Sequence, residues 1–117
     1  MTPKTINLPS IVTGDSFYGL TIGPITFNTV APDYPLDSCV LWIEADSGQV
    51  FQFKSDGTGD ALITIDDDVN WTVSIPPTPI LLPPSPGNWF YKTIDTAGVV
   101  RTLYKGRLDI TEGVPYG

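Results

Sequence analysis

The run Trp71-Thr72-Val73-Ser74-Ile75 is the part of this chain whose pattern decides the fold. Trp71, Val73 and Ile75 alternate with two small polar residues, and a period of two places the apolar side chains on one face of a β-strand. The acidic run Asp66-Asp67-Asp68 precedes it and is typical of a solvated turn. The pattern therefore predicts a strand with one face in a hydrophobic core.

Similar short runs, rich in β-branched and aromatic residues, recur on both sides of this strand. We expect an extended segment at 6–11, interrupted by Pro9, and further strands at 16–22, 39–45, 50–54, 61–65, 89–94, 99–103 and 107–111. Asp46-Ser47-Gly48 and Asp95-Thr96-Ala97-Gly98 have the composition of hairpin turns. No stretch has the 3.6-residue spacing of a helix. The sequence predicts an all-β, antiparallel β-sandwich of seven to eight strands.

Size and charge limit the classes of protein that fit. With 117 residues, the chain is expected to form a single domain over 1–117, and no apolar run is long enough to span a membrane. The formal net charge of −7 argues against a nucleic-acid partner. Residues 1–70 hold 2 basic and 10 acidic residues (net −8), whereas residues 71–117 hold 4 and 3 (net +1). This asymmetry permits head-to-tail packing of copies.

The absence of histidine, with Cys39 as the single cysteine, argues against an enzyme. Ser-His and Cys-His nucleophile pairs and nearly all zinc, copper and non-haem iron sites require residues that the chain lacks. Gly14-Asp15-Ser16 matches an esterase tripeptide but has no histidine to act as base. We therefore expect no catalytic residue, no metal and no cofactor. Cys39 cannot form an intramolecular disulfide and is expected to be a small buried apolar residue.

The order of features from Asp15 to Thr111 resembles a known family. The match is carried mainly by the chain's ending: Gly87, the aromatic run 89–91, Asp95-Thr96-Ala97-Gly98, Leu103 and Gly106-Arg107-Leu108-Asp109-Ile110. In this order these residues are similar to the immunoglobulin-like β-sandwich domain at the N-terminus of tailed-phage upper-baseplate proteins, which also occurs as short stand-alone phage proteins. The resemblance implies an immunoglobulin-like fold and a virion structural protein, made in the host cytoplasm. Such a protein would attach fibres or baseplate parts to the tail through protein–protein surfaces, as part of an oligomer.

The Pro-rich stretch at 76–87 departs from that family, whose members usually turn quickly at this point. Six of the eleven residues 76–86 are proline, which forbids a ladder strand or a helix interior there. Two interpretations are open: the stretch packs its apolar residues onto the end of the sandwich, or it offers them to another subunit. We expect the chain termini to be extended. The residues selected for a partner interface are apolar and lie in this loop or near the termini: Ile6, Leu8, Ile80, Leu81, Leu82 and Tyr116.

The alternative function is a carbohydrate-binding module for host surface glycans, with Trp89, Asn88 and Tyr91 as the sugar platform and Trp42 and Trp71 in the core. A third reading is a bacterial adhesin domain. Calcium binding at Asp66-Asp67-Asp68 is less favoured than a solvated turn. The basic residues near the end of the chain are expected on a polar face, where an acidic neighbouring copy could meet them: Lys92, Arg101, Lys105 and Arg107.

Overall fold

The computed structural model describes residues 4–5, 11–12, 16–17, 20–27, 29–79, 82 and 85–111. In these ranges the chain forms strands and turns and no helix, which confirms the expected all-β class. The strands are β1 (Lys4–Thr5), β2 (Ile11–Val12), β3 (Ser16–Phe17), β4 (Leu20–Ile22), β5 (Leu36–Ala45), β6 (Val50–Lys54), β7 (Ala61–Leu62), β8 (Thr64–Asp67), β9 (Thr72–Ile75), β10 (Thr78–Pro79), β11 (Ser85–Asp95) and β12 (Val100–Thr111).

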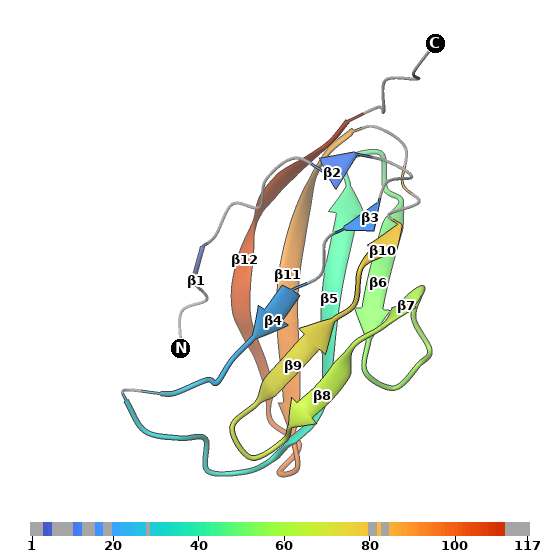
Figure 1. Ribbon diagram of the computed structural model, residues 1–117. Helices are drawn as coiled ribbons and strands as arrows, with labels where there is room; N and C mark the ends of the chain where they lie inside the picture. The colour runs from blue at the N-terminus through green and yellow to red at the C-terminus, as the bar shows by residue number, and fades with distance from the viewer. Residues whose placement is uncertain are drawn as a thin grey trace.

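The larger sheet has the order β1-β12-β11-β5-β6-β7, with β2 also paired to β12. Its four central strands are antiparallel hairpin partners or neighbours, whereas β1, β2 and β7 add short parallel pairings at the two edges. The smaller sheet, β4-β9-β8, is antiparallel and lies in front of the larger one in Figure 1. The expected antiparallel β-sandwich is therefore confirmed.

The strand order is that of an immunoglobulin-like domain. Seven strands have three residues or more, in agreement with the expected seven to eight. The order β12-β11-β5-β6 corresponds to the G-F-C-C′ sheet of that fold, and β4-β9-β8 corresponds to B-E-D. Hairpins join β5 to β6, β8 to β9 and β11 to β12, and the chain passes between the two sheets from β4 to β5, from β7 to β8 and from β9 to β11.

The core lies between the two sheets, where alternate residues of each strand point inward. Trp71, Val73 and Ile75 are at most 2% exposed, so the alternation that decided the fold is confirmed. On the facing sheet, Leu41 and Ile43 of β5 are each 1% exposed. Burial of these side chains removes enough apolar surface from water to drive the association of the two sheets.

Several strands differ in their bounds from those that the sequence predicted. The runs 99–103 and 107–111 belong to one continuous strand, β12, whose register against β11 shifts beside Tyr91 and Lys92. A β-bulge of this kind lets a long strand bend without a break. Trp71, expected inside a strand, precedes β9 with a φ of 57°. Asp66 and Asp67, expected in a turn, are the end of β8.

The Pro-rich stretch is also more regular than expected. Thr78 and Pro79 form β10 and pair with β3, and Ser85 and Pro86 begin β11. Proline removes one donor but keeps its carbonyl, and the Asp46 N–H donates to the Pro86 oxygen at 2.9 Å. The expectation that proline excludes ladder pairing throughout 76–86 was therefore wrong. These prolines stand at strand positions where the ladder does not need a backbone N–H.

Candidate docking surfaces

The outer face of the large sheet carries an aromatic pair. Trp42 of β5 and Phe90 of β11 are register partners whose side chains point away from the core, and both are half-buried. Their rings stack with centroids 5.6 Å apart and an interplanar angle of 13°. The Lys92 ammonium lies 5.0 Å from the centre of the Phe90 ring, within the range of a cation–π contact.

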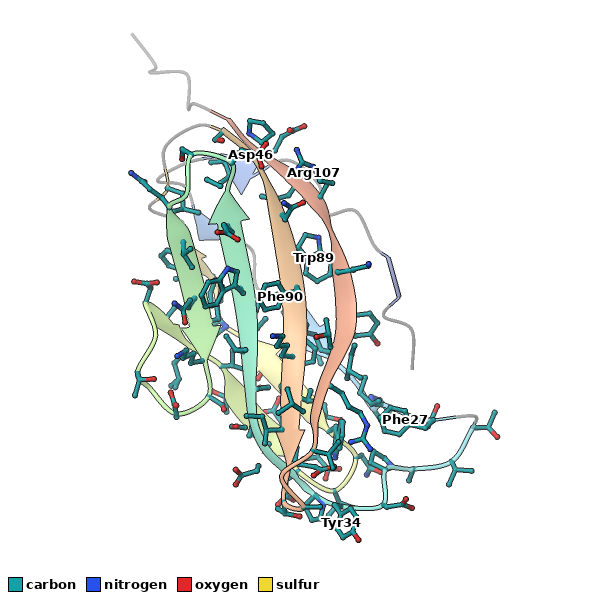
Figure 2. The ribbon with its side chains drawn as sticks, turned by 180° about the vertical axis from the view of Figure 1, so that it is seen from behind. Phe27, Tyr34, Asp46, Trp89, Phe90 and Arg107 are labelled. Carbon is teal, nitrogen blue, oxygen red and sulfur yellow. The ribbon has the colours of Figure 1, made fainter. Side chains whose placement is uncertain are left out.

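A hollow of about 530 Å³ lies beside this pair, between β11 and β12. It is lined by the Phe90 ring, the Asn88 amide and the basic side chains of Lys92, Lys105 and Arg107, together with Trp89, Thr102 and Gly106. We call this the basic hollow. No carboxylate lines it, although the protein carries a net charge of −7. Phe90 and Arg107, which line the hollow, are labelled in Figure 2.

The acidic residue closest to the basic hollow is Asp46, in the β5–β6 hairpin. Its carboxylate forms an exposed ion pair with Arg107 at 3.2 Å, and Arg107 also donates to the Asn88 side chain at 3.1 Å. Exposed pairs of this kind contribute little to stability. Lys92 and Lys105 form no ion pair with a residue in the described ranges. These two ammonium groups therefore give the hollow its positive charge.

A second surface is formed by three loops at one end of the sandwich, the lower end in Figure 1. They comprise residues 23–27 with 29–35, residues 68–71 and residues 96–99, and we call them the loop end. Backbone hydrogen bonds join them: the Leu36 N–H donates to the Asp68 backbone carbonyl at 2.8 Å, and the Thr96 N–H donates to the Pro35 carbonyl at 3.0 Å. The Trp71 indole N–H donates to the Tyr34 carbonyl at 2.8 Å. The loops are therefore fixed to one another and to the core.

A charged pair holds the hairpin loop of the loop end. Asp95 is 2% exposed, and its carboxylate accepts from Arg101 at 2.8 Å and from the N–H groups of Ala97 and Val99 at 3.0 Å each. Desolvation opposes ionisation of Asp95, but the Val99, Arg101 and Ala97 donors together hold its pKa below the usual value. The Arg101 guanidinium also lies 5.3 Å from the ring of Phe27. The pair thus joins the β11–β12 hairpin to loop 23–35.

Exposed apolar side chains gather at the loop end. The described residues include seven large apolar side chains that are at least 37% exposed. Six of them lie in the three loops or at the adjoining ends of β11 and β12, namely Val30, Tyr34, Val69, Ile94, Val99 and Val100; the seventh, Leu62, is in β7. Single exposed apolar residues are normal, but a gathered set marks a contact surface.

The loop end is also acidic. The exposed carboxylates Asp33, Asp37 and Asp68 lie in or next to its loops, and Asp66 and Asp67 end the strand that enters one of them. Asp67 accepts from the Asn70 side chain at 2.9 Å and from the backbone of Asn70 and Val69, and these bonds lower its pKa. The Asp67 carboxylate therefore stabilises the turn that follows β8. The described residues contain no group of His, Cys, Asp and Glu arranged to hold a metal ion.

Of the residues selected from the sequence for a partner interface, the structure describes Leu82 alone. Leu82 is 3% exposed and belongs to the core, so its selection as an exposed contact was wrong. Its burial agrees with the other interpretation of the Pro-rich stretch, in which the apolar residues pack onto the sandwich. Ile6, Leu8, Ile80, Leu81 and Tyr116 lie outside the described residues.

The aromatic assignments need a similar correction. Trp89 is 5% exposed and Tyr91 is fully buried, so they cannot form the sugar platform that the sequence suggested. Trp42, expected in the core, is the outward-facing aromatic instead. Trp71 and Cys39 are buried as expected. The sequence analysis missed Phe90, although the alternation along 88–91 required one aromatic of that run to face outward.

Comparisons with known proteins add one distant likeness. No family model matches the chain, and no curated protein sequence matches it. Among solved structures, the crystal structure of CopC from Methylosinus trichosporium OB3b aligns over 92% of this chain and 89% of its own, with a TM-score of 0.47 and 6% sequence identity. A likeness at this level carries no inference about what the chain binds. The described part of the chain contains no helix long and apolar enough to cross a membrane.

Proposed function

We propose that this protein is a non-enzymatic structural component of a bacteriophage virion, which joins tail, baseplate or fibre subunits by protein–protein docking. The four exposed apolar side chains in the loop end, with Ile94 and Val100 beside it, are the observation that carries the proposal. Loop-to-loop hydrogen bonds and the Asp95–Arg101 pair hold that surface in one conformation. A preformed apolar surface binds a protein partner at a small entropic cost. The family resemblance of the sequence supports the virion setting.

The test is co-sedimentation of the protein with intact phage particles in a density gradient of a host lysate. We expect it at a fixed copy number in the particle fraction. The double variant Val69→Ser/Val99→Ser, which changes only exposed side chains, should be lost from particles. Leu62→Ser is the matched control, because Leu62 is 49% exposed but lies away from the loop end. Absence of the unaltered protein from particles would overturn the virion proposal.

The outward-facing Trp42–Phe90 pair favours a second candidate function, the binding of host surface glycans. Sugar rings stack on aromatic side chains that face outward from a rigid sheet, as the half-buried Trp42 and Phe90 do, and amide groups such as Asn88 bind their hydroxyls. Affinity electrophoresis in gels containing host polysaccharide tests this function. We expect retardation that Phe90→Ala removes and that Val69→Ser/Val99→Ser leaves unchanged. Unchanged mobility of the unaltered protein in every polysaccharide would reject the glycan function.

A further inference from the structure

We propose that the basic hollow of one copy receives the loop end of a second copy, so that copies join head to tail. The inference rests on the proposed docking function and names one partner for both surfaces. Such a contact requires that the two surfaces have opposite charge, that both carry apolar groups, and that one copy can use both surfaces at the same time.

The charges of the two surfaces are opposite. Lys92 and Lys105 line the hollow and form no ion pair with a described residue, whereas Arg107, which also lines it, is paired with Asp46. The loop end presents Asp33, Asp37 and Asp68 as exposed carboxylates. Its cation Arg101 is already bound to Asp95 at 2.8 Å and does not neutralise them. Opposed charges of this kind orient two proteins as they meet and disfavour other orientations.

Apolar groups accompany the charges on both surfaces. The hollow has the Phe90 ring as a wall, continued by Trp42 on the neighbouring strand. The loop end offers Tyr34, 53% exposed, beside Val69 at 57%. Interfaces combine a central aromatic or aliphatic anchor with a charged rim, and the two surfaces supply both parts.

The placement of the charges disfavours contact between like surfaces. Two basic hollows would bring Lys92 and Lys105 against their own copies, and two loop ends would bring Asp33 and Asp68 together. Contact of a hollow with a loop end pairs cations with carboxylates, while the net charge of −7 makes the rest of the two molecules repel.

The positions of the surfaces allow each copy to use both. Tyr34 lies at the lower end of the molecule in Figure 2, whereas Phe90 and Arg107 lie further up the outer face of the large sheet. One copy can therefore insert its loop end into a neighbour while its own hollow receives another. Repetition of such a contact gives a closed ring or a filament.

The experiment is sedimentation velocity of the purified chain over a range of concentrations in low salt. The unaltered chain should sediment as species that grow with concentration. Lys92→Glu/Lys105→Glu reverses the hollow, and Asp33→Lys/Asp68→Lys reverses the loop end. Each double variant should weaken self-association by roughly tenfold or more, because one contact surface now repels the other. Asp109→Lys is the control for a charge change on an exposed residue outside both surfaces.

The variant with all four substitutions separates contact of hollow with loop end from contact between like surfaces, and growth beyond a dimer in sedimentation separates head-to-tail association from a reciprocal two-fold dimer. Its hollow is acidic and its loop end is basic, so it should associate with itself again. It should not associate with the unaltered chain, because hollow and loop end then carry like charges in both pairings. Fluorescence energy transfer between differently labelled copies measures this mixing. Circular dichroism before and after heating confirms that each variant is folded.

Three results would overturn the inference: an unaltered chain that stays monomeric in low salt, double variants that associate as the unaltered chain does, or a fourfold variant that stays monomeric while folded. None of these bears on co-sedimentation with phage particles, which tests the proposed function separately. Loss of particle binding with intact self-association would reject the virion role and keep the head-to-tail contact.

Discussion

Asp95 is the residue whose ionisation most directly supports the loop end. Its carboxylate is almost fully buried, and its pKa lies below the ordinary value because the donors of Val99, Arg101 and Ala97 outweigh desolvation. A carboxyl group with a lowered folded-state pKa stabilises the fold above its unfolded-state pKa of about 3.9. That stabilisation is lost as the pH falls through the folded-state pKa. The thermal midpoint should therefore drop steeply below about pH 4.

Asp95→Asn tests the origin of this acid sensitivity. The amide can still accept from the Ala97 and Val99 N–H groups, but it cannot pair with Arg101 as an ion. We expect a lower midpoint at pH 7 and a flatter decline below pH 4, measured by circular dichroism. Asp56→Asn is the comparison, since Asp56 also has a lowered pKa but lies in an exposed turn with Thr58. An equally steep acid decline in Asp95→Asn would assign it to other carboxylates.

Cys39 gives an independent report on core packing. Its side chain is 5% exposed, and burial raises the pKa of the thiol above its ordinary value. Only the thiolate reacts with disulfide reagents. We expect Cys39 to react with Ellman's reagent far more slowly in the folded protein than in denaturant. Equal rates with and without denaturant would contradict the burial of this side chain.

Among the elements, the pairing of β5 with β11 depends on Gly87. A Cβ atom at Gly87 would lie 2.5 Å from the Glu44 carbonyl oxygen, so the two backbones could not keep their separation. Gly87→Ala should therefore lower the free energy of unfolding by about 2 kcal/mol, the usual cost of a forced backbone shift. Asn88→Ala, on the next and outward-facing position, should cost no more than about 1 kcal/mol. Urea unfolding followed by fluorescence distinguishes the two, and equal costs would reject the steric explanation.

The sequence predicted the strands well where one face was clearly apolar. Val50–Lys54 became β6 with the predicted bounds, and Val73 and Ile75 point into the core. The ends of strands were harder to predict. β5 starts at Leu36 because backbone hydrogen bonds to other loops hold that segment, and the sequence pattern does not show those bonds. The place of Pro86 in β11 was not predicted for the same reason. Whether a proline interrupts a strand depends on whether the ladder needs a backbone N–H at that position.

The candidate site was less predictable than the strands. Trp89, Phe90 and Tyr91 are consecutive aromatics, so alternation required them to face opposite ways but did not say which parity faces the core. The register against β5 and β12 decides that Phe90 faces outward. Trp42 was misplaced because an apolar run such as 39–45 also fits a strand buried on both faces. Composition alone cannot show whether a strand is buried on one face, as in a two-layer sandwich, or on both faces.

At the scale of the whole molecule, the charge asymmetry of the sequence becomes a spatial separation. The acidic first 70 residues supply Asp33, Asp37 and Asp68 of the loop end, whereas Lys92, Lys105 and Arg107 of the hollow come from β11 and β12. Linear charge counts indicated head-to-tail packing as one option. Only the fold shows that the two charge groups lie on surfaces that also carry exposed aromatic or aliphatic side chains.

The sign of the salt effect on self-association distinguishes two physical causes. Two molecules of net charge −7 repel, so an association driven by apolar contact alone should strengthen as salt screens that repulsion. An association in which the basic hollow meets the acidic loop end loses its local attraction on screening. We expect the apparent dissociation constant to rise roughly tenfold between 0.05 and 0.5 M sodium chloride, measured by sedimentation. For Lys92→Glu/Lys105→Glu the residual association should change in the opposite direction, because only repulsion is left to screen. The same sign in both proteins would mean that charge pairing does not hold the copies together.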